Sequence, residues 1–198
     1  MFKTPVVTPE YEEQRLQALY SYDILGEGLA NELDNLVKLA AQIANVPMAY
    51  ISFIDREDLI LKSAFGVADE YKSLPRNITV CQHTMFYDHI FVLPDVSKDP
   101  YFSDNKIFAL GEGIRFYASA PLKDADGYPL GCLSLLANQP MQLEDYQLEA
   151  LATLAVQVVA QLALRKKNTQ LISQTKKFDE FIIEFLINKN SYVTDDKN

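Results

Sequence analysis

The chain contains few of the residues that build disulfide frameworks and metal centres: two cysteines and two histidines among 198 residues. Cys81 and Cys132 lie in apolar surroundings and form no Cys-x-x-Cys motif, so we interpret them as reduced thiols of a cytoplasmic protein. His83 and His89 have a spacing that does not put both rings on one helix face, and no cysteine pair stands beside them. The sequence therefore predicts neither a disulfide framework nor a metal site.

Long apolar runs and an excess of basic residues are also absent. The N-terminus has no apolar stretch after a basic start, so it shows no signal-peptide pattern. The most apolar window, Ala150 to Leu164, is too short to cross a bilayer and is interrupted by Thr153, Gln157 and Gln161. A formal net charge of -9 disfavours nucleic-acid and membrane-surface binding, because like charges repel. We expect a soluble cytoplasmic protein that binds neither.

The sequence does contain enough apolar material for a core, since 48% of its residues are hydrophobic. The two ends of the sequence show the apolar spacing of helices. Thr8 and Pro9 are typical of a helix start, and apolar residues at helical spacing follow from Leu16 to Ile24. A second helix is predicted from Leu29 to Ala44. A third helical pattern runs from about Leu143 to Lys189 without glycine or proline.

Between these helices the pattern changes to that of β-strands. Met48 to Ile54 is a mostly apolar run with β-branched and aromatic residues, which predicts a central strand. Leu59 to Phe65 is predicted as its neighbour, joined to it by a short charged link. Phe91 to Leu93 is predicted as a short strand. Ile114 to Leu122 and Leu130 to Ala137 flank an Asp-Gly dipeptide, which is typical of a tight hairpin.

The middle of the chain is less regular. Val67 to Asn77 is predicted as a surface loop, Ile78 to Tyr87 fits a strand or a short helix, and Val96 to Glu112 is predicted as loop with one short helix. Strands clustered between terminal helices predict an α+β fold: a central antiparallel sheet, N- and C-terminal helices on one face, and a loop-covered pocket on the other. We divide the chain into an N-terminal tail (1–8), one domain (9–165) and a C-terminal helical extension (166–198).

A series of short motifs runs in order from Glu10 to Arg165. They are Glu13-x-Arg15-x-x-Ala18-Leu19, Asp34-x-Leu36-x-x-Leu39-Ala40, Ile51-Ser52-Phe53-Ile54-Asp55, Lys62-Ser63-x-x-Gly66, Pro75-Arg76-x-x-x-x-Cys81, Leu93-Pro94-Asp95 with Asp99-Pro100-x-Phe102, Ile114 to Leu122, and Gly127-x-x-Leu130-Gly131-x-Leu133. In this order and spacing they resemble the GAF domain family, and within it the subgroup found beside histidine kinases and diguanylate cyclases.

The resemblance implies a sensory module of signal transduction that binds a small molecule or a partner protein and acts on a histidine kinase or cyclase-type output partner. No catalytic output motif follows in these residues, so we do not expect an enzyme. The cofactor stays unknown. The signature of cyclic-nucleotide-binding relatives is incomplete after Asn105-Lys106, and the Cys-His arrangement of bilin-binding relatives is displaced at Cys81 and His83.

Alternation along two strands predicts where a ligand would bind. Arg115, Tyr117 and Ser119 fall on one side of their strand, and Cys132 and Ser134 alternate with leucines on the next. A concave face with a few convergent polar groups suits a small-molecule pocket. The predicted pocket residues are Ser52, Phe65, Cys81, His83, Arg115, Tyr117, Ser119, Cys132 and Ser134.

Two of these residues, and the function itself, have alternative interpretations. Cys81 either lines the pocket or carries redox, covalent or metal chemistry, since a nearby imidazolium lowers a thiol pKa. Arg115 either contacts a ligand or pairs with a carboxylate such as Asp95 or Asp55. The alternatives to a sensor are a small redox enzyme of the GAF fold that uses Cys81, similar to methionine sulfoxide reductases, and a purely structural dimerisation domain.

The C-terminal helix carries a heptad-like apolar pattern, formed by Leu148, Leu151, Ala155, Val158 and Leu162. Further on, Phe178 to Ile187 is too apolar to stay exposed. We therefore expect a homodimer that pairs the terminal helices as a coiled coil. The alternative is a helix that breaks near Lys167 to Thr169 and folds back.

Overall fold

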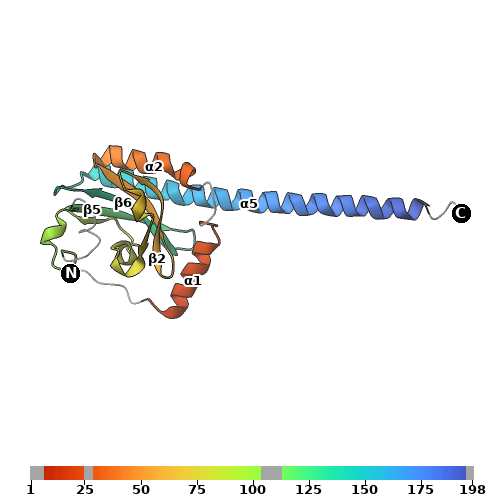
Figure 1. Cartoon of the computed structure of the whole chain (residues 1–198), viewed down its shortest axis with the longest axis horizontal. Coiled ribbons are helices and arrows are strands. Elements are labelled where there is room, and N and C mark those ends of the chain that lie inside the picture. The colour runs from red at the N-terminus through yellow and green to blue at the C-terminus, as the bar shows by residue number, and fades with distance from the viewer. Residues whose placement is uncertain (1–6, 25–28, 104–112, 195–198) are drawn as a thin grey trace. The chain divides into compact units, whose positions relative to one another are not determined.

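The structure is a computed structural model that describes residues 7–24, 29–103 and 113–194 (Figure 1). The predicted end of the irregular segment, including Asn105-Lys106, lies outside these residues. The chain divides into two compact units, Met1–Gln161 and Leu162–Asn198, which are described in turn.

The first unit is built on a six-stranded antiparallel sheet with the order β3-β2-β1-β6-β5-β4. Its strands are β1 (Met48–Ile54), β2 (Asp58–Phe65), β3 (Ser73–Pro75), β4 (Phe91–Leu93), β5 (Phe116–Lys123) and β6 (Pro129–Ala137). The predicted α+β fold with a central antiparallel sheet is therefore confirmed. Within the segment predicted as a surface loop, the structure adds β3, which pairs with β2 at the edge of the sheet. Ser73 and Pro75 leave one apolar residue between them, so this segment has no strand pattern from which to predict it.

In the part of the chain that the structure describes, helices accompany the sheet on both of its faces. They are α1 (Pro9–Tyr20), α2 (Leu29–Ala44), α3 (Cys81–Thr84) and α5 (Asp145–Thr194), with short 3-10 turns at η1 (Asp69–Tyr71), η2 (Arg76–Ile78) and η3 (Val96–Lys98). The predicted start of α1 is confirmed, because the Thr8 hydroxyl accepts a hydrogen bond from the Tyr11 amide at 3.2 Å. α1 ends earlier than its apolar stripe suggests, so Ile24 lies beyond the helix although it is buried.

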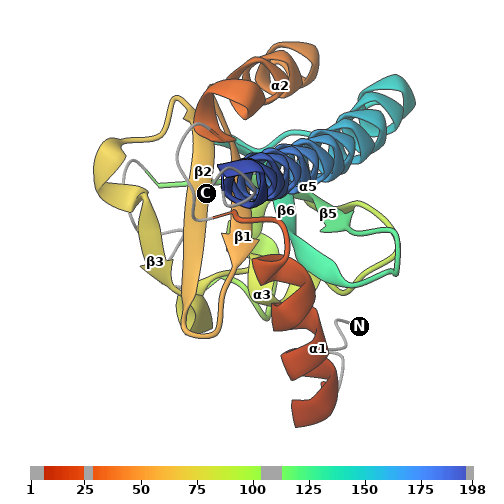
Figure 2. The same cartoon turned by 90° about the vertical axis from the view of Figure 1, so that its right-hand side faces the viewer.

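α2 and the first part of α5 lie together on one face of the sheet (Figures 1 and 2). The Gln147 side chain of α5 donates a hydrogen bond to the Ile43 carbonyl of α2 at 2.9 Å. The Ser63 hydroxyl of β2 donates to Asp34 of α2 at 2.6 Å. A bulge at Lys62 shifts the register of β2 against β1, and so turns Ser63 toward this face. The buried side chains of this layer include Leu33, Val37, Ala40, Ile51, Phe53, Leu133, Leu135, Leu151 and Val158.

The opposite face of the sheet is covered by the irregular middle of the chain, as predicted. α3, η3 and the turns around them bury a second apolar cluster against it, with α3 behind β1 in Figure 2. Its members include Ile54, Leu59, Val80, Met85, Leu93, Val96, Phe102, Ile114 and Leu136. The sheet therefore separates two cores, and the second one also contains tyrosine and cysteine side chains.

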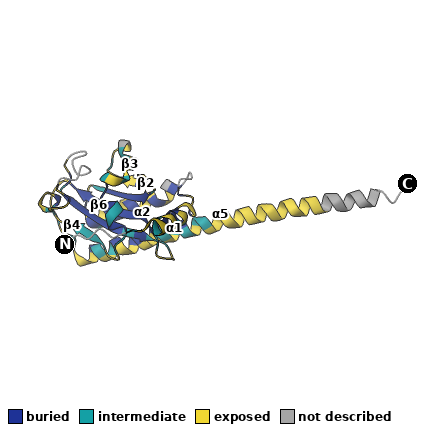
Figure 3. Cartoon of the chain, turned by 90° about the horizontal axis from the view of Figure 1, so that it is seen from below, coloured by how far each residue is buried: buried dark blue, intermediate teal, exposed yellow. Residues whose placement is uncertain are grey.

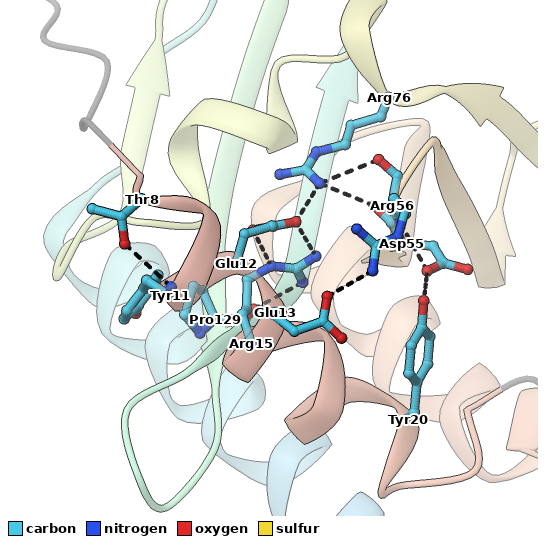
Figure 4. Close-up of polar contacts among 10 residues, drawn as sticks. All are labelled: Thr8, Tyr11, Glu12, Glu13, Arg15, Tyr20, Asp55, Arg56, Arg76 and Pro129. Carbon is cyan, nitrogen blue, oxygen red and sulfur yellow. Dashed lines mark hydrogen bonds and ion pairs between the residues drawn. The ribbon is translucent and has the colours of Figure 1, made fainter.

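α1 is held to the domain by a network of charged groups (Figure 4). Arg15 is completely buried; its guanidinium makes two hydrogen bonds to the Glu12 carboxylate, each 2.9 Å long, and a third to the Pro129 carbonyl at 3.3 Å. Arg76 of η2 reaches the same carboxylate at 2.5 Å and the Asp55 carbonyl at 3.2 Å. Glu12 thus joins α1 to the turn after β3, while Arg15 joins it to the start of β6.

The second unit is the continuation of α5, and the helix runs through Lys167 to Thr169 without a break. Its side chains are mostly exposed as far as Phe185 (Figure 3). Among the described residues, α5 is the one helix whose length and composition would suffice to cross a membrane, and 33% of its most apolar 18-residue window is buried. Core helices of soluble proteins share this composition. The start of α5 is such a core helix, because its Leu151 and Val158 side chains are buried against the domain.

Candidate functional site

Eight polar side chains converge on the loop-covered face of the sheet and are completely or almost completely buried there. They come from β1, α3, β5 and β6 and form what we call the polar cluster: Tyr50, Ser52, Cys81, Thr84, Tyr117, Ser119, Cys132 and Ser134. A polar group can be buried at low cost only if it finds a hydrogen-bond partner. Among the described residues, no buried side-chain nitrogen or oxygen lacks such a partner.

The Cys81 thiol stands at the centre of the polar cluster. Its sulfur lies 3.2 Å from the Tyr117 hydroxyl and 3.6 Å from the hydroxyls of Tyr50 and Ser134. The Ser52 hydroxyl donates to the same sulfur at 3.8 Å. One thiol is therefore surrounded by four hydroxyl groups from three adjacent strands.

The remaining members surround the second thiol. The Thr84 hydroxyl lies 3.7 Å from the Cys132 sulfur and accepts a hydrogen bond from Ser119 at 3.0 Å. Cys81 and Thr84 are three residues apart on α3, so they share one side of this helix turn. That side faces the sheet, where it meets Ser134 and Cys132, respectively.

Their surroundings shift the pKa values of the two thiols in opposite directions. Hydrogen bonds from Cys132 and then from Tyr117, Ser134 and Tyr50 outweigh the effect of burial and lower the pKa of Cys81 to about 6. Burial and the hydrogen bond with Cys81 raise the pKa of Cys132 well above its usual value. Burial and the neighbouring Cys81 charge likewise raise the pKa of Tyr117 and Tyr50, so both phenols stay protonated and can donate. Of the two thiols, Cys81 is therefore the one that ionises more readily.

This assignment predicts a measurable titration. We expect the thiolate absorbance of the folded protein to rise with a midpoint near pH 6, and the Cys81→Ser variant to lack this step. Because the folded pKa lies below the ordinary value of 9.0, thiolate formation stabilises the fold above that value, and the effect is lost as pH falls through about 6. Ultraviolet absorbance against pH, with circular dichroism to confirm folding, checks both statements. Two thiols that ionise only above pH 8 would contradict them.

The other predicted pocket residues lie outside the polar cluster. The ring of half-buried His83 lies against Tyr101 and Phe102, and burial, followed by the charge of Arg76, lowers its pKa. Phe65, at the end of β2, is 38% exposed. The structure thus groups Ser52, Cys81, Tyr117, Ser119, Cys132 and Ser134, and leaves Phe65 and His83 apart from them.

Arg115 pairs with a carboxylate. It comes just before β5, and its guanidinium makes hydrogen bonds of 3.0 to 3.1 Å to both carboxylate oxygens of Asp95. The Arg115 side chain is 41% exposed. Its backbone accepts a hydrogen bond from the Val96 amide at 2.7 Å. This pair fixes η3 to the beginning of β5, which is the structural role considered for Arg115 from the sequence.

Sequence reasoning missed two members of the cluster, Tyr50 and Thr84. Tyr50 alternates with Ser52 on β1, so the same alternation that selected Ser52 could have selected it. Thr84 could be selected only if Ile78 to Tyr87 was known to contain a helix turn, because that turn points the Thr84 and Cys81 side chains toward the sheet together.

A small cavity of about 130 Å³ lies elsewhere, beside the end of α1. Its walls are mainly apolar, and the Tyr20 hydroxyl donates to Asp55 beside it at 2.5 Å. The lining residues are Leu19, Tyr20, Asp23, Ile24, Phe53, Asp55 and Ile60. No pattern in the sequence predicts a cavity at this position.

Comparison with known proteins identifies the segment that carries this site. The sequence model described as GAF domain matches residues 29–162. The chain is 29% identical over 132 residues to the protein described as cyclic di-GMP phosphodiesterase PA2567 from Pseudomonas aeruginosa. The matched part is 67% of this chain and 22% of that protein, so the chain spans about a fifth of the relative's length.

Solved structures share the fold at low identity. A domain of a two-component sensor histidine kinase protein from Sinorhizobium meliloti matches with a TM-score of 0.58 and 14% identity, covering 75% of this chain and 99% of that one. The GAF domain of a phosphoenolpyruvate-protein phosphotransferase from Coxiella burnetii matches with a TM-score of 0.61 and 14% identity, covering 81% of this chain and 95% of that one.

Proposed function

The chain belongs to the GAF domain family, whose members are sensory and regulatory domains of signalling proteins, and we propose that it is a dimeric sensory module that passes a signal through α5. The proposal places it in the cytoplasm and assigns it a binding role rather than a catalytic one. Its input is a small molecule or a partner protein. Its output belongs to the histidine kinase or cyclic-dinucleotide enzyme class, the classes to which two of its relatives belong.

The observation that carries the proposal is a row of exposed apolar side chains on α5. Leu164, Leu171, Phe178 and Phe185 follow one another at intervals of seven residues, and each is between 54% and 62% exposed. We call these four residues, with Ile182 beside them, the apolar seam. A strict seven-residue repeat keeps one helix face toward a partner helix in a left-handed coiled coil.

The intervening positions favour a specific pairing. If the seam leucines and phenylalanines occupy the d positions of the heptad, the a positions hold Asn168, Thr175 and Ile182. A single asparagine at an a position selects one register and a low oligomer number in parallel coiled coils, because its amide can be satisfied only by the same residue of the partner. Two parallel chains in register are therefore the arrangement that suits this helix.

Pairing of two helices would bury the exposed apolar seam. Burying a leucine or phenylalanine side chain contributes about 1.5–3 kcal/mol. Four such side chains on each of two chains contribute on the order of 12–24 kcal/mol at most, against an association cost of about 4–15 kcal/mol. The upper part of this gain exceeds the whole range of the association cost, so burial of the complete seam favours the dimer.

The polar cluster supports the sensory part of the proposal. A ligand that enters it must replace hydrogen bonds made by Cys81, Tyr117 and Ser134, and so must offer polar groups in their place. The cluster lies on one face of β6, while the start of α5 packs near Leu135 on the other face. A ligand-induced shift of β6 would therefore act directly on the first turns of α5.

Dimerisation through the seam is tested by sedimentation. We expect the full chain to be a dimer at micromolar concentration and a chain ending at Arg165 to be a much weaker dimer or a monomer. Leu171→Glu should weaken the dimer by about 100-fold or more, since it removes two buried leucines and places two like charges together, a loss of about 3–6 kcal/mol.

The matched control adds the same charge on another side of the helix. Ser173 is two residues from Leu171, about 200° around the helix, so Ser173→Glu should leave the dimer unchanged. A full-length chain that is monomeric at micromolar concentration, or a Leu171→Glu variant that stays dimeric, would rule out pairing through this seam.

A further inference from the structure

Cys81 and Cys132 are far apart in the sequence and are brought into one buried cluster by the fold. Cys81 begins α3 and Cys132 lies in the middle of β6, and both are completely buried free thiols. A cysteine often behaves as a small apolar residue in a core. Here, however, the Cys81 sulfur lies close to four hydroxyl groups, and the Cys132 sulfur lies 3.7 Å from the Thr84 hydroxyl.

The strand register explains the contact. Ser52 of β1 is directly opposite Cys132 of β6, and the Ser52 hydroxyl reaches the Cys81 sulfur. Ser134, two residues along β6, also contacts the Cys81 sulfur, and Thr84 contacts Cys132. Cys81 therefore lies above the stretch of β6 that carries Cys132, and the two thiols are near enough for each to shift the pKa of the other.

The two thiols are not equivalent chemically. The Cys81 sulfur lies within hydrogen-bond distance of four hydroxyl groups, whereas the Cys132 sulfur has one such contact, with Thr84. The pKa of Cys81 is lowered, and that of Cys132 is raised. The thiolate is the reactive form of cysteine toward peroxides, and a neighbouring protonated thiol can then resolve the oxidised product. The contacts thus distinguish an attacking sulfur from a resolving one.

We propose that Cys81 and Cys132 form an oxidation site for hydrogen peroxide, with Cys81 as the nucleophile and Cys132 as the resolving thiol. The Cys81 thiolate attacks one peroxide oxygen, the O–O bond breaks, and the products are a Cys81 sulfenic acid and hydroxide. The Cys132 thiolate, formed by loss of its proton to that hydroxide, attacks the Cys81 sulfur and releases a second hydroxide, which takes up a proton to give water. Two thiols and one peroxide thus yield one disulfide and two waters.

Access to the proposed site requires local opening of the fold, because both sulfurs are completely buried. α3, a single helix turn packed on β5 and β6, is the segment whose displacement would expose Cys81. The disulfide also requires the sulfurs to approach to about 2.05 Å. Its formation removes the charge to which Tyr50, Tyr117 and Ser134 donate, and so changes the hydrogen bonds between three strands.

Mass spectrometry of the intact, folded chain tests the proposal. After treatment with hydrogen peroxide and alkylation of the remaining thiols, we expect both cysteines to escape alkylation together, and dithiothreitol to restore both. A non-reducing digest should contain the Cys81 peptide linked to the Cys132 peptide. The rate should rise with pH as Cys81 ionises. These measurements on the unaltered chain remain decisive even if a variant fails to fold.

Two matched variants assign the roles. Cys132→Ser should accumulate a sulfenic acid that one molecule of dimedone traps, because the resolving thiol is missing. Cys81→Ser should leave Cys132 in its reduced form. The proposal is overturned if both thiols of the folded chain survive peroxide that oxidises the denatured chain, if the disulfides are intermolecular, or if Cys81→Ser reacts as fast as the unaltered chain. None of these outcomes depends on dimerisation through α5.

Discussion

Replacing Glu12 with glutamine is expected to destabilise the domain by about 3 kcal/mol, the lower end of the range for breaking a buried ion pair. The Glu12 carboxylate is 18% exposed and accepts from both Arg15 and Arg76, of which Arg15 is completely buried. Without the carboxylate, the Arg15 charge has no counter-ion among the contacts drawn in Figure 4 and keeps the Pro129 carbonyl as a neutral acceptor. An uncompensated buried charge is costly, which is why the expected effect is large. Urea denaturation measures it.

The adjacent residue provides the control. Glu13 pairs with Arg56, but both side chains are more than half exposed. A solvated pair of this kind contributes at most about 1 kcal/mol, so Glu13→Gln should change the unfolding free energy little. Equal effects of Glu12→Gln and Glu13→Gln would show that the buried network does not stabilise the fold.

The Glu12 effect should also depend on pH. Burial raises the pKa of Glu12, but hydrogen bonds from Arg15 and Arg76 outweigh it, so the pKa is lowered from 4.5. A carboxyl with a lowered folded pKa stabilises the protein fully above its ordinary value and loses this contribution as pH falls through the folded value. The difference between the unaltered chain and Glu12→Gln should therefore be constant near neutral pH and shrink in acid below pH 4.5.

Gly131→Ala is expected to have the largest effect on folding. A Cβ atom at this position would lie 1.9 Å from the Ser52 carbonyl oxygen and 2.8 Å from the Phe53 Cα. Both are backbone atoms of β1, which pairs with β6 at this point, so no flexible side chain can move aside. We expect a loss of more than about 4 kcal/mol, a size that accompanies disrupted core structure. Much of the stability of a domain of this size would be lost.

Gly127→Ala is the control, because it replaces a glycine without creating a steric clash. Gly127 has a φ of 86° in the β5–β6 turn, and an added Cβ there would meet no atom within 4 Å. Gly127→Ala should therefore cost only about 1–2 kcal/mol, from its left-handed backbone. Circular dichroism and urea denaturation of both variants make the comparison. A Gly131→Ala protein as stable as Gly127→Ala would contradict close pairing of β1 and β6 at this point.

Glu12 and Gly131 both lie close to segments that carry the candidate site. Glu12 ties α1 to Arg76, five residues before Cys81, and Gly131 is adjacent to Cys132. The network and the close strand pairing thus hold the segments that carry the two thiols. Variants at either position should be checked for folding before any change in thiol chemistry is interpreted.

The sequence by itself determined the secondary structure of most of the domain. The bounds of α2, β1 and β4 agree with those predicted, because each segment has one dominant period and clear ends. The Asp-Gly turn predicted the β5–β6 hairpin. Alternation also placed Tyr117, Ser119, Cys132 and Ser134 on a common face, since side chains on a strand can point in only two directions.

Only the tertiary structure decided which of these residues meet. The helix turn at Cys81 brings its thiol near Cys132. Arg15 pairs with Glu12 of its own helix, and Arg76 reaches the same carboxylate from a turn far along the sequence. The bulge at Lys62 turns Ser63 to the opposite face from that expected of strict alternation. Local periodicity specifies the direction of each side chain within its own element. Contacts between elements depend on register and on how segments cross, and these are set by packing of the whole chain.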